Sequence, residues 1–179
     1  MKLSDLSRPI FLCGMMGSGK STIGKIMAHK TGLHFQDLDH IIEDGEKMSI
    51  PEIFSKRGET YFRKTEEFWL IHNSQTLRGI LALGGGSLQH QQLVDHIKMY
   101  GWLIFLDSSS SVLYNRLKKS KNRPMLSAGD DLKKRIDTLL EKRRPFYEQA
   151  HITIKTDSLK KNEIVTELIN KIKLYEGRN

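Results

Sequence analysis

The residues with the clearest chemistry form one glycine-rich segment near the start of the chain. Residues 14–22, GMMGSGKST, match the pattern G-x-x-x-x-G-K-[ST] in full and directly follow the apolar run 10–13. Glycines let successive backbone N–H groups turn toward phosphate oxygens, and a helix that begins here adds its positive N-terminus. We therefore predict a phosphate-binding loop in which Lys20 contacts the β- and γ-phosphates of a nucleotide and the Ser21 hydroxyl can bind Mg²⁺. A glycine-rich turn that only joins a strand to a helix is the alternative.

Two carboxylates, Asp37 and Asp39, follow the next stretch of extended character. If this segment stays extended, the two side chains point the same way. One carboxylate could then help to hold Mg²⁺ while the other orients an acceptor hydroxyl or takes its proton. The same pair is also typical of a helix N-cap or of a surface pair, and the residues alone leave this choice open.

A glycine triplet and an arginine are candidates for binding a second substrate. The triplet, residues 84–86, follows the apolar run 80–83 and favours either close approach of a ligand to the backbone or a flexible turn. Arg63 stands three residues before Glu66, so the two side chains can pair on one helix face. Such pairs are usually surface pairs, but an arginine positioned by a carboxylate can also bind a substrate carboxylate in a bidentate way.

Positive charge is concentrated in one segment. The whole chain of 179 residues has a formal charge of +8, and residues 116–144 hold eleven Lys or Arg and four Asp or Glu. Pro124 and Gly129 interrupt this segment between two predicted helices, which favours a mobile lid at about 116–131. Such a lid brings cations to the transferred phosphate and excludes water, although its lysines can equally form a solvated helix face.

Strands and helices alternate along the chain. Apolar runs at 10–13, 79–83 and 103–106 are too continuous for amphipathic strands and indicate strands that are buried on both faces, and residues 152–154 add a further strand. Helical spacing of apolar residues covers the ranges 21–30, 50–56, 62–77, 110–119, 132–148 and 161–175. This alternation predicts a three-layer α/β/α sandwich around a mostly parallel sheet, with residues 1–179 as a single domain.

The composition excludes several other classes of protein. The single cysteine, Cys13, allows no internal disulfide and no thiolate metal cluster. No apolar run approaches the roughly 20 residues of a membrane helix, and residues 1–9 lack the apolar stretch of a signal peptide. We therefore expect a soluble, cytoplasmic protein without membrane contacts, and a monomer because no heptad pattern is present.

Taken together, these motifs resemble the shikimate kinases, which are small P-loop kinases of the nucleoside monophosphate kinase-like group. The resemblance runs from about Ile10 to Ile154 and rests on residues 14–22, 37–43 (DLDHIIE), 49–54 (SIPEIF), 58–63 (GETYFR), 83–86 (LGGG), 123–126 (RPML) and 143–147 (RRPFY). It implies phosphoryl transfer from ATP to the 3-hydroxyl of shikimate, a step toward chorismate and the aromatic amino acids. It also implies a substrate-binding region at about 37–65.

The resemblance further implies a role for each site residue. Asp39 would act on the 3-hydroxyl as a base or as a positioning group, while Lys20 and Arg123 would stabilise charge on the transferred phosphoryl group. Arg116 would stack on adenine. The implied nucleotide contacts are Gly17, Ser18, Gly19, Lys20, Ser21, Thr22, Arg116 and Arg123; Mg²⁺ would be bound by Ser21 and Asp37, and shikimate by Asp39, Arg63, Gly84, Gly85, Gly86 and Arg143.

The chain departs from the family's pattern at a few positions. Lys47 stands where the family usually has a glycine, so the resemblance does not define the conformation of the turn before residue 49. Met125 and Phe146 are apolar replacements that leave the implied arginines in place. Because Arg143 is followed by Arg144, the choice of Arg143 as the carboxylate ligand depends on the register of the motif.

Two alternative functions use the same phosphate loop. A gluconate-type or nucleotide kinase would share the fold but would need an acceptor set different from Asp39, Arg63 and Arg143. A nucleic-acid-binding P-loop protein would use the basic segment 116–144, but this segment contains no aromatic residue for stacking on bases. The charge surplus therefore favours a nucleotide over a nucleic acid as the partner.

Overall fold

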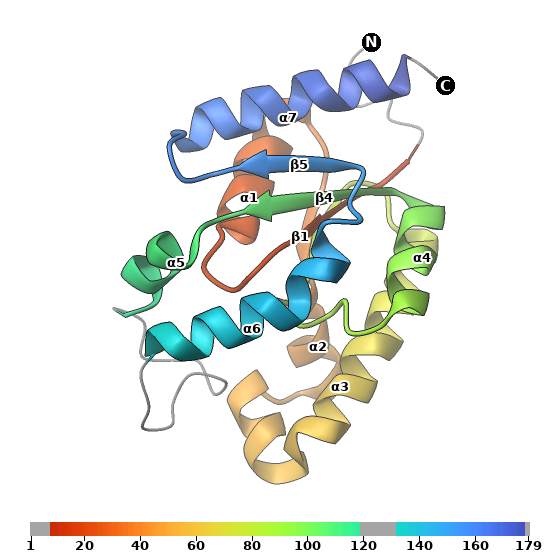
Figure 1. The fold of residues 1–179 in the computed structure, drawn as a ribbon. Coiled ribbons are helices and arrows are strands. Elements are labelled where there is room, and N and C mark those ends of the chain that lie inside the picture. Colours follow the sequence, from red (N-terminus) through yellow and green to blue (C-terminus); the bar gives the residue numbers. More distant parts are fainter. Residues whose placement is uncertain (1–7, 119–131, 178–179) are drawn as a thin grey trace.

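The computed structural model describes residues 8–118 and 132–177, and the statements below concern these residues. At its centre is a sheet in which every strand pairing is parallel, in the order β2-β3-β1-β4-β5 (Figure 1). The strands are β1 (Ile10–Cys13), β2 (Phe35–Asp37), β3 (Ile80–Ala82), β4 (Trp102–Asp107) and β5 (Ile152–Lys155). The predicted parallel sheet is confirmed.

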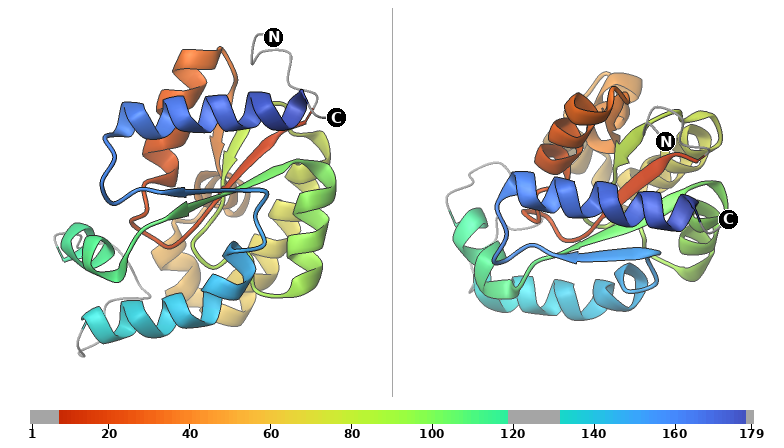
Figure 2. Two further views of the ribbon diagram at one scale, coloured as in Figure 1. Left: turned by 45° about the horizontal axis from the view of Figure 1, so that its top comes forward. Right: turned by 90° about the horizontal axis from the view of Figure 1, so that it is seen from above.

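Helices cover both faces of this sheet. They are α1 (Lys20–Thr31), α2 (Leu38–Glu46), α3 (Ile50–Thr76), α4 (Gln91–Tyr100), α5 (Ser110–Leu117), α6 (Leu132–Tyr147) and α7 (Lys161–Glu176). Apolar side chains of α1 and α7 pack on one face, and those of α3, α4 and the end of α6 pack on the other (Figures 1 and 2). The predicted three-layer α/β/α sandwich is therefore confirmed.

The burial of the strands follows from this arrangement. Every residue of β1 and β3 is buried, because helices lie on both sides of the central strands. Residues of the edge strand β5 alternate between buried and exposed, as in a strand with one face in the core. No helix in the described ranges is long and apolar enough to cross a membrane.

The two helices predicted at 50–56 and 62–77 are joined in α3, which breaks at Gly58. Gly58 has φ 79° and ψ 171°, a combination that is essentially restricted to glycine. The break folds the first part of α3 back on the second, so that the rings of Phe54 and Phe62 lie 4.7 Å apart. These two rings form an apolar wall of the cavity described below.

The turn between α2 and α3 contains Lys47 where a glycine was expected. Lys47 itself adopts the left-handed conformation, with φ 53° and ψ 31°, and ends α2. The nearby Gly45 serves another purpose, since a Cβ there would lie 2.2 Å from Cζ2 of Trp69. The turn that leads into Ser49 is therefore made at the cost of a strained lysine.

Candidate active site

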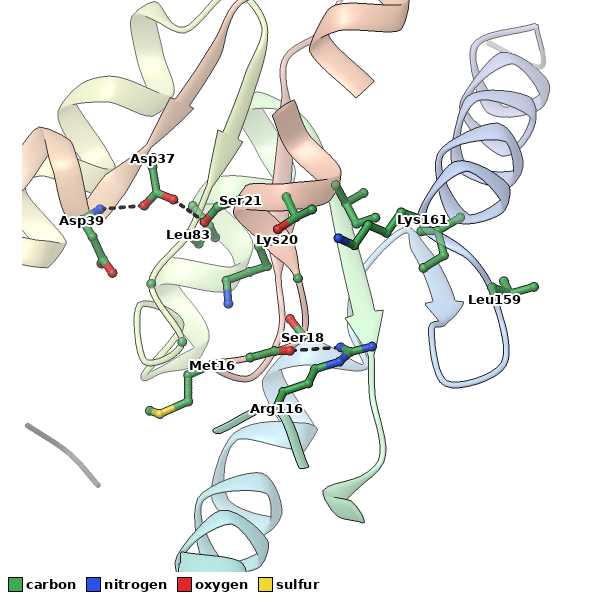
Figure 3. Close-up of a pocket in the computed structure, with 17 residues that line it drawn as sticks. Met16, Ser18, Lys20, Ser21, Asp37, Asp39, Leu83, Arg116, Leu159 and Lys161 are labelled. Carbon is green, nitrogen blue, oxygen red and sulfur yellow. Dashed lines mark hydrogen bonds between the residues drawn. The ribbon is translucent and has the colours of Figure 1, made fainter. Parts of the chain in front are cut away.

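The chemically interesting residues meet at the carboxyl edge of the sheet. The phosphate loop follows β1, Asp37 ends β2 and the glycine triplet follows β3. Ligands of open α/β sheets bind at this edge. Two adjoining cavities of about 550 and 720 Å³ lie here and share lining residues, among them Ser21, Asp37 and Asp39. They form one continuous cleft, of which Figure 3 shows the first part.

The phosphate loop has the backbone that its glycines predict. Gly17 and Gly19 have φ values of 82° and 99°, and Gly19 is the N-cap of α1. A Cβ on Gly14 would lie 2.7 Å from the carbonyl oxygen of Leu106. The N-terminus of α1 therefore opens into the cleft, which is the arrangement that binds phosphate.

Lys20 is held inside this loop. Its residue is 9% exposed, and its ammonium donates hydrogen bonds to the carbonyl oxygens of Gly14 at 2.9 Å and Met15 at 3.2 Å. In Figure 3 its side chain projects into the middle of the pocket, between Asp37 and Arg116. The loop thus presents a cation beside its amide donors, as binding of a polyphosphate requires.

Asp37 links the loop to the start of α2. Its Oδ2 accepts a hydrogen bond from the Ser21 hydroxyl at 2.5 Å, and its Oδ1 accepts one from the backbone N–H of Asp39 at 3.1 Å (Figure 3). The expectation that residues 37–39 stay extended is wrong, because Asp37 caps a helix that begins at Leu38. Asp37 therefore caps α2 and at the same time lines the cleft. The Asp39 side chain also lines the cleft, although it belongs to the first turn of the helix.

The pairing of Ser21 and Asp37 fits a magnesium ion. A hydroxyl and a carboxylate oxygen in contact offer two hard oxygen ligands. Within the described ranges, no group of three or more His, Cys, Asp or Glu side chains is arranged to hold a metal ion. Magnesium in phosphate sites uses one or two protein ligands together with the phosphates and water, so this pair is sufficient.

Arg63 and Glu66 form a buried ion pair on the opposite side of the cleft. Arg63 Nη1 lies 2.6 Å from Glu66 Oε2, and the Glu66 side chain is only 1% exposed. The alternative interpretation of these two residues as a surface pair is therefore excluded. Glu59 lies 3.4 Å from the same guanidinium with a 54% exposed side chain, so Glu66 is the partner that fixes Arg63.

The glycine triplet leaves room for these side chains. A Cβ on Gly84 would lie 2.4 Å from Glu66 Oε1, and a Cβ on Gly86 would lie 2.7 Å from Arg63 Nη1. The same Gly84 Cβ would be 3.3 Å from Asp39 Oδ1. The glycines thus allow close approach of the backbone to the charged groups of the cleft, and the alternative of a merely flexible turn does not explain these contacts.

The two adjacent arginines of α6 point in different directions. Arg143 Nη1 donates to the carbonyl oxygen of Gly85 at 2.8 Å and lines the larger cavity. Arg144 instead pairs with Asp107 at 2.8 Å and with Glu148 at 3.0 Å. The hydroxyl of Tyr147 also donates to the Gly85 carbonyl, and burial raises its pKa so that it stays protonated. Of the two arginines, Arg143 is therefore the one that can reach a ligand.

The outer end of the smaller cavity lies between α5 and α7. Arg116 lines it and donates to the carbonyl oxygen of Gly17 at 3.0 Å (Figure 3). Leu159, Lys161 and Ile164 line the other side, and the motifs gave no sign of them. The one feature of the sequence that could have indicated these three residues is that they follow β5, the last strand to end at this edge of the sheet. Arg123 and residues 119–131 of the predicted lid lie outside the described residues.

The fold and the cleft define a P-loop kinase: a parallel sheet, a complete phosphate loop and a second, charged cavity that adjoins it. The shikimate kinase family model matches residues 16–173. The shikimate kinase of Thermodesulfovibrio yellowstonii is 39% identical over 89% of this chain and 92% of its own. That of Chlorobaculum tepidum is 40% identical over 94% of this chain and 92% of its own. The chain belongs to the shikimate kinase family.

A solved structure agrees with this assignment. Shikimate kinase from Acinetobacter baumannii in complex with shikimate superimposes with a TM-score of 0.87 at 32% identity, and the match covers 92% of both chains. Both the fold and the sequence therefore place this chain among ATP-dependent small-molecule kinases.

Proposed function

We propose that this chain transfers the γ-phosphoryl group of ATP to the 3-hydroxyl of shikimate, with the cleft divided into two halves. The nucleotide half consists of residues 17–22 and Arg116. The acceptor half consists of Asp39, Arg63, Gly84, Gly85, Gly86 and Arg143. The observation that carries this proposal is that the two adjoining cavities share Asp39, so a donor and an acceptor can meet there. The relative from Acinetobacter baumannii, solved with shikimate, supports the choice of acceptor.

The acceptor half suits a small carboxylated polyol. Arg63 and Arg143 reach the larger cavity from α3 and α6, and a guanidinium binds a carboxylate through two parallel hydrogen bonds. Phe54 and Phe62 supply an apolar wall for the carbon ring. We propose that the backbone of the glycine triplet lies against that ring, since no side chain separates the two.

Asp39 acts on the acceptor hydroxyl. Its backbone N–H is fixed by Asp37, which leaves the Asp39 carboxylate at the boundary of the two cavities. There it orients the 3-hydroxyl toward the phosphate and accepts its proton as the new P–O bond forms.

The nucleotide half neutralises charge on the transferred group. Lys20 exchanges the carbonyl oxygens of its own loop for oxygens of the β- and γ-phosphates, and the N–H groups of Gly17–Thr22 hold the rest of the polyphosphate. Ser21 and Asp37 would hold Mg²⁺, which would supply positive charge to neutralise the phosphate oxygens. Arg116 packs against the adenine base at the outer end of the cavity.

Three further proposals rest on the sequence alone. A role for Arg123 in stabilising the transferred phosphoryl group stays a prediction because this residue lies outside the described ranges. Action as a monomer and location in the cytoplasm are likewise predictions. Each can be tested separately from the reaction.

A panel of acceptors tests the proposed function. ADP release is measured with ATP and equal concentrations of shikimate, gluconate and the nucleoside monophosphates. We expect turnover with shikimate, and turnover at least about 10²-fold lower with gluconate and with every nucleoside monophosphate. These other acceptors would leave the charged groups of the acceptor half unpaired. Equal or greater turnover with gluconate or with a nucleotide would overturn the proposal.

A further inference from the structure

Ser87 is a buried polar residue that neither the motifs nor the reaction has used so far. It directly follows the glycine triplet and is 1% exposed. Its hydroxyl donates a hydrogen bond of 2.7 Å to Glu66 Oε1. Its backbone N–H donates to the carbonyl oxygen of Gly84 at 3.3 Å, so the serine closes the turn that the triplet makes. Ser87 thus connects the triplet to the buried carboxylate.

The two oxygens of Glu66 are divided between two donors. Oε1 accepts from Ser87, and Oε2 accepts from Arg63 Nη1 at 2.6 Å. A carboxylate that is 1% exposed cannot turn to water for a missing hydrogen bond, so each oxygen needs its donor within the protein. The bond to Ser87 therefore fixes the rotation of the Glu66 carboxylate and with it the oxygen that faces Arg63.

Arg63 has a second carboxylate within reach. Glu59 contacts its Nε and Nη2 at 3.4 Å from the exposed side of α3. If Glu66 loses its fixed orientation, the guanidinium is drawn toward Glu59 and away from Gly86, against whose Cα it now lies. The position of Arg63 in the cavity is thus set by the shorter, buried bond.

We propose that Ser87 is a positioning residue for the acceptor, which acts through Glu66 on the orientation of Arg63. This proposal rests on the proposed function, because it assigns to Arg63 the binding of the substrate carboxylate. Ser87 does not touch the reacting atoms. Its loss should therefore weaken shikimate binding and leave the phosphoryl transfer step and the nucleotide half unchanged.

The test is a split between kinetic constants in the full-length chain. Ser87→Ala should raise the KM for shikimate about 10-fold, as expected for loss of one hydrogen bond to a buried charge, with kcat and the KM for ATP within about twofold of wild type. Ser87→Cys, which keeps a side chain of similar size with a weaker donor, should give a smaller rise. If Ser87→Ala does not fold, the KM of Ser87→Cys decides, and an unchanged value overturns the proposal.

A matched control and a double substitution separate positioning from stability. Ser74 lies on α3, the helix of Arg63 and Glu66, and is 2% exposed; its hydroxyl donates to the carbonyl oxygen of Ile71 at 2.8 Å and lies 2.8 Å from His96 Nε2. Ser74→Ala should leave the KM for shikimate within about twofold, and a rise equal to that of Ser87→Ala would overturn the proposal. In an Arg63→Lys background, Ser87→Ala should add no more than about twofold, because the group on which it acts is gone. A full 10-fold rise there would contradict the proposed path.

Failure of this inference differs from failure of the proposed function. Wild-type protein without shikimate-dependent ADP release would refute the function and with it the role of Ser87. Wild-type turnover combined with an unchanged KM in Ser87→Ala would refute the role of Ser87 alone.

Discussion

The two halves of the cleft are built in different ways. The nucleotide half is mostly backbone, because one loop of consecutive residues between β1 and α1 supplies its N–H donors and its lysine. The acceptor half is mostly side chains from α2, α3 and α6, which lie around the backbone of the glycine triplet. Its two arginines are each held by an acceptor nearby, Arg63 by the Glu66 carboxylate and Arg143 by the Gly85 carbonyl.

This difference separates recognition of the donor from recognition of the acceptor. A backbone cradle binds phosphate whatever the rest of the ligand is, so the nucleotide half suits a whole class of enzymes. A set of oriented side chains distinguishes one acceptor from another, because an ill-fitting ligand leaves buried charges unpaired. Substitutions in the acceptor half should therefore change the kinetics of shikimate and not those of ATP.

The largest expected effect is at the boundary between the halves. Asp39→Asn should lower kcat at least about 10²-fold, because an amide cannot accept the hydroxyl proton, while ATP binding is kept. Steady-state rates together with nucleotide titration measure both quantities. Near-normal kcat in this variant would show that Asp39 does not act on the hydroxyl.

A substitution within the acceptor half should affect binding of one substrate. Arg63→Lys should raise the KM for shikimate by about 10- to 100-fold, since a lysine cannot form the bidentate pair, and should leave the KM for ATP unchanged. The exposed Glu59 offers a matched control, and Glu59→Gln should change neither constant by more than about twofold. A parallel rise in the KM for ATP would remove the distinction between the halves.

A backbone position can disturb the same arginine without removing any charge. A Cβ on Gly86 would lie 2.7 Å from Arg63 Nη1, which is the far end of a flexible side chain and can move aside. Gly86→Ala should therefore raise the KM for shikimate about 10-fold and lower the stability of the fold, because Arg63 cannot move aside without weakening its bond to the buried Glu66 carboxylate. Initial rates and a urea unfolding curve check the two parts, and an unchanged KM would mean that Arg63 has more freedom than its contacts indicate.

The nucleotide half of the cleft could be predicted from the sequence, but the acceptor half could be predicted only in part. The phosphate loop is a local motif, and the positive φ values of Gly17 and Gly19 follow directly from it. The burial of Glu66 and the contact of Ser87 with it depend on the packing of α3 against the segment after β3, which no local pattern encodes. The resemblance to a family supplied Arg143, and the structure then separated its direction from that of Arg144.

The same reasoning explains which parts of the fold were predicted. Continuous apolar runs identified β1, β3 and β4 because helices cover both of their faces. The short helix α2 was not predicted because it begins inside the Asp37–Asp39 motif. The hydrogen bond from the backbone N–H of Asp39 to the Asp37 side chain favours a helix there over a continued strand. The continuity of α3 across Gly58 was not predicted because a glycine at such a position usually marks the end of a helix.

A substitution in the turn between α2 and α3 should change stability and not kinetics. Lys47→Gly removes the left-handed strain at φ 53° and should raise the free energy of unfolding by about 1 kcal/mol. Urea unfolding measures the gain, and both KM values should stay at their wild-type levels. A loss of stability would show that the lysine side chain contributes contacts that outweigh the strain.

The smallest expected effect lies at the opposite end of the sheet, away from both halves. His151 Nδ1 accepts a hydrogen bond from the backbone N–H of Leu103, and burial, with Lys98 and Arg8 nearby, lowers its pKa below 6.5. The folded chain thus binds this proton less readily than the unfolded chain. Stability from this residue is present above pH 6.5 and is lost as the pH falls through the lowered pKa.

Unfolding by urea at pH 7.5 and pH 5.5 checks this effect. His151→Gln, which does not titrate, should show a smaller loss of stability between the two pH values than the wild type shows. An equal loss in both proteins would mean that His151 contributes nothing to the pH dependence.

The most direct test of the account is the identity of the product. The wild-type chain is incubated with ATP, Mg²⁺ and shikimate, and ³¹P and ¹H NMR then locate the transferred phosphoryl group. We expect a single phosphomonoester on the 3-hydroxyl of shikimate, formed in equal amount with ADP. Phosphorylation of another hydroxyl, or release of inorganic phosphate in place of the ester, would contradict it.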